Sequence, residues 1–146
     1  MSTRYPIPAH CAVLRNSSGA VLLIRRAGDG PYSGRWSLPG DVFEGGCDWM
    51  TSLNRMLSRL SIEAAPGRLT GIYSDPAELC VDGPAGKDHR LVACFRVDQH
   101  TGSPRAGSEI IDLGWFSLGQ LPESLPKAEA RMIQDAMGFD GGVKVR

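Results

Sequence analysis

Short apolar runs divide the first third of the chain into predicted strands. Residues 6–14 are apolar and rich in strand formers, and residues 21–24 form a second, near-continuous apolar run. Residues 16–19 lie between them with turn composition, so we expect the two runs to pair as a β-hairpin. A further short strand is expected at residues 36–38, where the Pro-Gly pair that follows stops it.

Two segments carry the period of a helix instead. After residue 48 the apolar residues recur at helical spacing: Trp49, Leu53, Met56, Leu57 and Leu60. Asp48 precedes them and has the side chain of an N-cap. A second helix is expected over residues 127–137, because Pro126 suits its start and Gly138 suits its end.

The remaining apolar runs predict three more strands, at residues 69–73, 90–97 and 110–116, and the run at 90–97 is the clearest of the chain. Residues 75–87 contain two prolines and two glycines and read as a long loop. Strands that flank one central helix, with a second helix at the end, predict an α+β sandwich with a mixed sheet.

Length and composition add few further constraints. The chain has 146 residues, which suits a single domain over residues 1–146, with about 1–5 and 140–146 expected to be flexible. The formal net charge is zero, which argues against general nucleic-acid binding. No apolar run approaches the roughly 20 residues of a membrane span, and the first eight residues lack the apolar core of a signal peptide. We therefore expect a cytoplasmic protein.

The four cysteines, Cys11, Cys47, Cys80 and Cys94, are scattered along the chain without any Cys-x-x-Cys pair. Their spacing to the three histidines does not match that of a zinc site. Buried, reduced thiols are therefore the expected state of these side chains.

Several segments, taken in order, resemble the Nudix hydrolases. They are LLIRR at 22–26, GRWSLPG at 34–40, FEGG at 43–46 with the helix that follows, the strand at 90–97 and EIIDLGWFSLGQLP at 109–122. The resemblance spans nearly the whole chain, and its W-x-L-P-G segment is the most specific part. It implies the Nudix fold, an α/β/α sandwich with a mixed β-sheet, and magnesium-dependent hydrolysis of a phosphoanhydride.

The catalytic signature of that family, G-x5-E-x7-R-E-U-x-E-E-x-G-U with U a bulky aliphatic residue, is mostly absent. Anchored on the Pro-Gly pair at 39–40, its arginine falls on Arg55, but its glutamates fall on Cys47, Met56, Arg59 and Leu60. Magnesium requires hard oxygen ligands, which these four side chains do not offer. The resemblance therefore implies a degenerate Nudix box, weak Mg²⁺ binding and slow or altered hydrolysis.

Some carboxylates near the box remain as candidates. Glu44 and Glu109 are the expected catalytic residues, and Glu44, Asp48 and Glu109 are tentative ligands for a weakly held Mg²⁺. Each has a structural alternative: Asp48 as the helix N-cap, and Glu109 with Asp112 as solvent-facing side chains.

Four arginines are the expected ligand-binding residues: Arg25, Arg26, Arg35 and Arg55. The first three flank the position where phosphates bind in the fold that the sequence resembles, and guanidinium groups suit phosphate geometry. At least one of them has the alternative of solvating a strand edge. Arg55 lacks its usual glutamate partners, and Glu44 is the remaining candidate partner.

The edge of the first helix is apolar at Trp49, Met56 and Leu60. These side chains pack in the core, or they form an exposed patch for a homodimer or another protein partner, or the box is misaligned. Trp36 and Trp115 are interpreted as core or rim aromatics.

Three functional hypotheses remain open at this stage. The first is a Nudix-type hydrolase that acts on a nucleoside-diphosphate-type or other phosphoanhydride ligand with a depleted metal site. The second is a catalytically inactive module that binds such a phosphorylated small molecule. The third is a protein-interaction module that uses the apolar helix edge. Composition does not specify the ligand, which we expect residues 75–88 to select.

Overall fold

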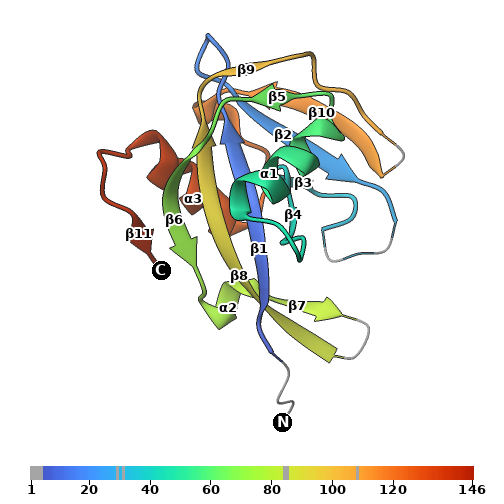
Figure 1. Ribbon diagram of the computed structural model, residues 1–146. Helices are drawn as coiled ribbons and strands as arrows, with labels where there is room; N and C mark the ends of the chain where they lie inside the picture. Colours follow the sequence, from blue (N-terminus) through green and yellow to red (C-terminus); the bar gives the residue numbers. More distant parts are fainter. Residues whose placement is uncertain (1–4, 29, 31, 84–85, 108) are drawn as a thin grey trace.

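The computed structural model describes residues 5–28, 30, 32–83, 86–107 and 109–146 (Figure 1). Its largest sheet has the strand order β11 (Lys144–Val145), β6 (Arg68–Tyr73), β8 (Gly86–Val97), β1 (Ile7–Leu14) and β4 (Gly40–Val42), with β7 (Cys80–Gly83) paired to β8. A second sheet has the order β10 (Ile110–Phe116), β2 (Val21–Arg26) and β3 (Trp36–Ser37). Strands β5 (Glu63–Ala64) and β9 (His100–Thr101) form a separate pair. The helices are α1 (Trp49–Ser58), α2 (Pro76–Leu79) and α3 (Lys127–Met137), with a 3₁₀ turn at Leu118–Gln120.

The large sheet is mixed, as the sequence predicts. Strands β1 and β8 run parallel, with Ile7 opposite Arg90 and Leu14 opposite Val97. The pairings of β1 with β4 and of β8 with β6 are antiparallel. Strand β8 therefore lies inside the sheet, where its long apolar run is covered.

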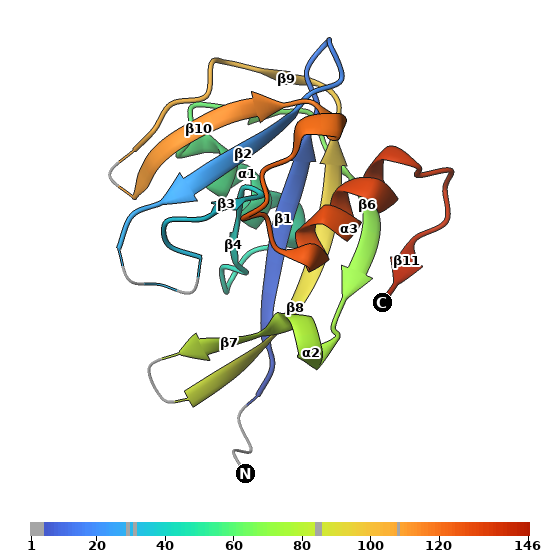
Figure 2. The same ribbon diagram turned by 180° about the vertical axis from the view of Figure 1, so that it is seen from behind.

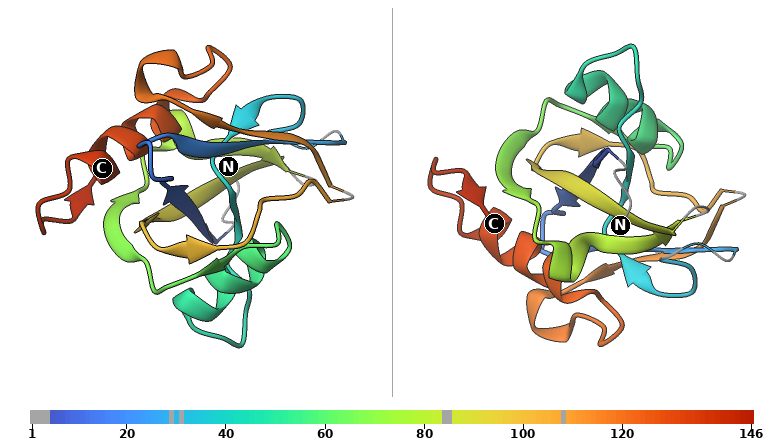
Figure 3. Two further views of the ribbon diagram at one scale, coloured as in Figure 1. Left: turned by 90° about the horizontal axis from the view of Figure 1, so that it is seen from above. Right: turned by 90° about the horizontal axis from the view of Figure 1, so that it is seen from below.

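Helices α1 and α3 cover opposite sides of the strands, which the views from above and below show (Figure 3). Side chains alternate between the two faces of a strand. Along β1, Cys11 and Val13 therefore join the core beneath α3, whereas Ala12 and Leu14 join the core beneath α1. The predicted sandwich, with one helix on each side, is confirmed.

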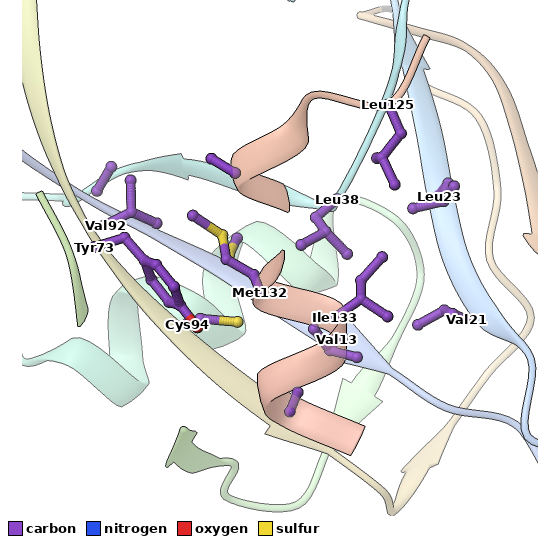
Figure 4. Packing of buried hydrophobic residues seen from close by; sticks show 14 of the residues in the cluster. Val13, Val21, Leu23, Leu38, Tyr73, Val92, Cys94, Leu125, Met132 and Ile133 are labelled. Atoms are coloured by element: carbon purple, nitrogen blue, oxygen red, sulfur yellow. The ribbon is translucent and has the colours of Figure 1, made fainter. Parts of the chain in front are cut away.

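The core beneath α3 includes a residue of the segment that joins β3 to β4. Met132 and Ile133 of α3 pack among Val13, Leu23 and Leu38, all of them buried (Figure 4). Leu38 belongs to the segment that joins β3 to β4, so the same core holds this segment and the start of α3 together.

The expected hairpin of residues 6–14 and 21–24 is wrong. The turn itself forms, because Asn16 Oδ1 accepts hydrogen bonds from the N–H groups of Ser18 and Ala20. Beyond the bridge between Arg15 and Val21, however, β1 and β2 diverge into different sheets (Figure 2). Both strands are buried on both faces, so their apolar runs do not show which neighbour each one takes.

Residues 75–87 are more regular than the predicted loop. Asp75 caps α2 through a hydrogen bond of 2.9 Å from the N–H of Ala77, and β7 then pairs with the start of β8. The tail is exposed, and β11 within it pairs in parallel with β6. The flexibility expected for residues 140–146 stays a prediction, and that for residues 1–5 falls mostly outside the described residues.

The cysteines and the start of α1 can also be compared with their predictions. All four cysteines are free thiols, and the expected burial is found for Cys11 and Cys94, whereas Cys47 and Cys80 are only half-buried. Asp48 caps α1, since its Oδ1 accepts a hydrogen bond of 2.8 Å from the N–H of Thr51. Across the described part of the chain, no helix combines the length and the apolar character that a membrane crossing requires.

Candidate functional site

A cavity of about 470 Å³ opens beside the junction of β3 and β4. Ligand pockets for small molecules span roughly 300–1,000 Å³, so this volume suits a nucleotide-sized compound. Its wall is built by β1, β4, the segment after β2, the region from α2 to β7, β8 and the start of α3. Gly40 lies so close to β1 that a Cβ atom there would come within 2.5 Å of the His10 carbonyl oxygen. The Pro-Gly pair thus lets β4 approach β1 beside the cavity.

A buried carboxyl group, that of Glu129, lies in the wall of this cavity. Its Oε1 accepts a hydrogen bond of 2.5 Å from the backbone N–H of Leu38. Burial raises the pKa of Glu129 to about 7, and the hydrogen bond from Leu38 and the positive charges of Arg26 and Arg35 oppose that rise. At neutral pH this carboxyl group can therefore exchange a proton, and it can donate or accept a hydrogen bond.

Three arginines also line the cavity: Arg26, Arg35 and Arg90. Arg26 donates from Nη2 to the Gly40 carbonyl oxygen, which fixes its guanidinium at the cavity wall. The guanidinium carbon of Arg90 lies 5.8 Å from the ring centroid of Tyr32, another lining residue. Arg26 and Arg35 are expected ligand-binding residues that line this cavity, and their binding role stays a prediction. Arg90 and Tyr32 line it too and were not proposed from the sequence.

Arg25 points elsewhere. Neighbouring residues of a strand face opposite sides, so Arg25 and Arg26 diverge. Arg25 donates to the Gly34 carbonyl oxygen at 3.2 Å, and its guanidinium carbon lies 5.6 Å from the ring centroid of Trp36. It is not among the lining residues, and its predicted role in ligand binding stays a prediction. Trp36 in turn packs edge-on against Phe116 at 4.8 Å, as expected for a rim aromatic.

The apolar edge of α1 is mostly core. Met56 and Leu60 are 6% and 3% exposed and pack against strands β1, β2 and β8. For these two residues the core alternative holds and the exposed-patch alternative is wrong. Trp49 differs, because it is 38% exposed and packs against the ring of Phe43 at 4.6 Å.

Two ion pairs connect α1 to β4 and the loop that follows it. Arg55 Nη1 lies 3.1 Å from Glu44 Oε2, so the structure contains the contact predicted for Arg55. Arg59 Nη1 lies 2.9 Å from Asp41 Oδ2, which the sequence did not suggest. Asp41 also lines the cavity, whereas Arg59 is not among the lining residues.

The three tentative metal ligands are not gathered into one site. Among the described residues, no group of three or more His, Cys, Asp or Glu side chains could hold a metal ion. Glu44 pairs with Arg55 and Asp48 caps α1. Glu109 is exposed, and its backbone oxygen accepts a hydrogen bond of 2.9 Å from the N–H of Ala27, which lines the cavity. Asp112 is exposed too, and its carboxylate accepts from the N–H of Leu113.

A buried polar contact lies behind β4. His10 Nε2 is 2.8 Å from Ser52 Oγ, and the same oxygen accepts a hydrogen bond of 2.9 Å from the N–H of Glu44. Burial lowers the pKa of His10 as the main cause, and Arg59 lowers it further, whereas Asp41 opposes this. The contact ties β1, α1 and the loop carrying Glu44 together.

The sequence contained a signal for Glu129 that could have been read. On α3, the buried residues Met132 and Ile133 follow Glu129 by three and four positions. Helical residues at these spacings share one face. An acidic residue on the apolar face of a predicted helix marks a carboxyl group that faces the interior, and such groups gather at functional sites.

The family of this chain follows from a sequence profile, that of the NUDIX domain, which matches residues 5–136. The chain belongs to the Nudix family. The predicted Nudix fold agrees with this match and with solved structures. A search of curated proteins found no match.

Solved structures of Nudix proteins share the fold. A MutT NUDIX hydrolase from Burkholderia pseudomallei is 24% identical, with a TM-score of 0.76 over 90% of this chain and 98% of that one. A MutT protein from Methanosarcina mazei Go1 is 21% identical, with a TM-score of 0.77 over 97% and 100%. An ADP-ribose pyrophosphatase from Streptococcus suis 89-1591 is 19% identical, with a TM-score of 0.66 over 97% and 100%.

Proposed function

We propose that this Nudix protein binds a nucleoside-diphosphate-type or other phosphoanhydride ligand in the cavity beside Glu129, and that it hydrolyses this ligand slowly. The carrying observation is the charge arrangement of the cavity. Arg26, Arg35 and Arg90 bring guanidinium groups to its wall, and Glu129 is a single buried carboxyl group among them. Guanidinium forks match phosphate oxygens, so the arginines provide for the charged part of the ligand.

The uncharged part of the ligand has partners in the same cavity. Tyr32 offers an aromatic face, and burial together with the negative charge of Glu129 raises the pKa of its hydroxyl, which keeps Tyr32 neutral. Glu129 offers a hydrogen-bonding group that is held in place by Leu38. A ligand with a polar ring at one end and a phosphoanhydride at the other fits this division. The name of the Streptococcus suis relative, an ADP-ribose pyrophosphatase, supports a ligand of this class.

Slow hydrolysis follows from the side chains of α1. Aligned on the family signature, the positions of three box glutamates carry Met56, Arg59 and Leu60, and two of these are buried in the core. Glu44 and Glu109 remain as proposed catalytic carboxylates, and a magnesium ion held weakly by Glu44, Asp48 or Glu109 would polarise the phosphoanhydride. The burial of Met56 and Leu60 also favours a second candidate, a binding module with no turnover.

A contact with a second copy or another protein through the edge of α1 has fewer exposed residues available than the sequence suggested. Of the three residues proposed for a homodimer or protein contact, Trp49 alone remains well exposed. The cytoplasmic location stays a proposal that rests on composition.

A thermal-shift screen tests ligand recognition. ADP, ADP-ribose and UDP-glucose are added to the purified protein, and a ligand at about 100 times its dissociation constant stabilises the fold by about 2.7 kcal/mol. We expect Arg35→Gln and Arg90→Gln to weaken the shift, and Arg68→Gln to leave it unchanged, since Arg68 is exposed on β6 away from the cavity lining. The absence of any stabilising ligand contradicts the proposal.

Turnover is measured separately, by chromatography of the products with Mg²⁺ present. Ordinary enzymes turn over at about 10 per second. We expect a rate several orders of magnitude below this value, and a rate near it would contradict the slow-hydrolysis part. A rate indistinguishable from the uncatalysed reaction favours the binding module.

A further inference from the structure

The magnesium ion that the family implies does not fit the first helix of this chain. Mg²⁺ takes oxygen ligands in a strict octahedral arrangement, commonly one or two carboxylates with water and phosphate oxygens. Met56 and Leu60 have no oxygen in their side chains and lie in the core. Arg59, at the C-cap of α1, carries a positive charge that repels a cation.

That positive charge lies beside a residue of the cavity lining. Arg59 Nη1 is 2.9 Å from Asp41 Oδ2, and Asp41 lines the cavity. The Arg59 side chain is 60% exposed, so a solute can reach it. Arg55 lies four residues earlier on the same helix face, and its guanidinium pairs with Glu44 on the same side of α1.

We propose that the Arg59 guanidinium supplies to the ligand phosphates the positive charge that a divalent cation would supply, so that this chain binds phosphoanhydrides without magnesium. The inference rests on the proposed function, since it concerns how the same ligand is held. It assigns a binding role to a side chain that replaces a carboxylate of the family signature.

The ion pair with Asp41 does not prevent this role. Exposed ion pairs contribute little to stability because water and salt compete with them, so a phosphate can displace the carboxylate. A guanidinium group has five N–H donors in a planar fork, and the contact with Asp41 engages Nη1. The remaining donors suit two phosphate oxygens at once.

The arrangement also explains the charge balance around the cavity. Four cationic and four acidic side chains line the cavity, and the buried acid among them, Glu129, has a pKa of about 7, so it is partly protonated at neutral pH. The cations are Arg26, Arg35, Lys87 and Arg90, and the other acids are Asp41, Glu78 and Asp82. Arg59 adds a fifth cation next to Asp41. With Arg59 included and Glu129 partly protonated, positive charge exceeds negative charge around the cavity.

The first test is calorimetric titration of inorganic pyrophosphate into the protein in the presence of EDTA. We expect the wild-type chain to bind, Arg59→Gln to bind about tenfold more weakly, and Arg68→Gln to bind within twofold of wild type. Arg68 is an exposed arginine on β6 and matches the change in charge and size. Binding by the wild type that requires Mg²⁺, or unchanged affinity in Arg59→Gln, would overturn the inference.

The second test reverses the charge. Arg59→Glu places a second carboxylate beside Asp41, and two carboxylates are a sufficient protein contribution to a magnesium site. We expect this variant to bind Mg²⁺ at least tenfold more tightly than the wild type does, and Arg68→Glu to match the wild type. No gain in Arg59→Glu would show that residue 59 does not lie where a metal could bind, and would overturn the inference.

The outcomes separate this inference from the proposed function. If ADP-ribose stabilises the protein only with Mg²⁺, the proposed function stands and the inference fails. If pyrophosphate binds in EDTA through Arg59 while no nucleotide derivative stabilises the fold, the inference stands and the proposed ligand class is wrong.

Discussion

The carboxyl oxygen Oε1 of Glu129 lies 2.5 Å from the backbone nitrogen of Leu38, so a buried acid on α3 holds the segment between β3 and β4. The bond connects two of the elements that form the cavity wall. Oε1 is the carboxyl oxygen that accepts this bond from the N–H of Leu38.

The pH dependence of stability should report this buried acid. Burial raises the pKa of Glu129 from 4.5 to about 7. Between these values the folded state keeps the proton and the unfolded state loses it, so the free energy of unfolding falls as pH rises and levels off above about pH 7. We expect Glu129→Gln to lack this fall, which is on the order of 3 kcal/mol.

Urea unfolding at a series of pH values between 4.5 and 8 measures the difference between wild type and variant. Glu123→Gln is the matched control, because Glu123 is exposed in the segment before α3. It should keep the wild-type slope. Identical slopes for wild type and Glu129→Gln would show that the acid is ionised in the folded state throughout.

A second prediction concerns the buried edge of α1. Met56→Glu and Leu60→Glu each place a carboxylate in the core that contains Leu53 and Leu57. Burying a carboxylate without a partner is strongly unfavourable, and the apolar contacts are lost as well. We expect each variant to lower the free energy of unfolding by about 3 kcal/mol or more.

Ser58→Glu is the control for these helix variants, since Ser58 is exposed on the same helix. Urea unfolding compares the three proteins. A stable Met56→Glu variant that gains Mg²⁺ binding would show that residue 56 lines an open metal site, and would contradict the assignment of this edge to the core.

A third prediction concerns the serine that orients the Glu44 loop. Ser52→Ala removes the hydroxyl that accepts from the N–H of Glu44 and contacts His10 Nε2, and it leaves both groups without that partner. An unsatisfied buried group costs about 1–3 kcal/mol, so the free energy of unfolding should fall by that amount. Ser58→Ala, which loses an exposed bond to the Asn54 carbonyl oxygen, should change it far less. Equal effects would mean that the His10 contact is not formed.

Much of the fold could be predicted from the sequence because its signals are local. The strand at 110–116 and the helix at 127–137 match β10 and α3 residue for residue, since turn residues, Pro126 and Gly138 mark their ends. Asp48 could be predicted as the N-cap of α1 because its residue type is common at that position. The pairing of β1 was not predictable in this way, because a strand buried on both faces has no alternation that identifies its neighbour.

The candidate site was predicted only in part, and for a similar reason. Arg26 and Arg35 belong to a motif with a recognisable order, so their place at the cavity could be inferred. Arg59 and Asp41 are far apart in the sequence, and their ion pair depends on the packing of α1 against β4. Glu129 was overlooked because a helix with one acid on its apolar face still has the period of an ordinary helix.

The last prediction concerns the tail, where the sequence indicates flexibility and the structure shows an anchor. Arg146 Nε and Nη2 lie 2.9 and 3.0 Å from the two carboxylate oxygens of Asp135, and the hydroxyl of Tyr73 donates to Asp135 Oδ2 at 2.6 Å. The hydrogen bond from Arg146 and that from Tyr73 lower the pKa of Asp135 against the effect of its burial. This contribution to stability is present above the unfolded pKa of about 3.8 and is lost as pH falls through the lower folded value.

We therefore expect Tyr73→Phe to lower the free energy of unfolding by about 1–2 kcal/mol at pH 7, and Arg146→Gln to lower it as well. Both differences should shrink at pH values below the folded pKa of Asp135, where the carboxyl group is protonated. Lys127→Gln, an exposed change at the start of α3, is the control and should leave stability unchanged.

Hydrogen exchange then separates the two descriptions of the tail. Slow exchange of the Arg146 amide, which donates to the Ile72 carbonyl oxygen at 2.9 Å, means that β11 is held in place. Fast exchange of this amide together with a neutral Arg146→Gln variant would mean that the tail is flexible, as the sequence predicts.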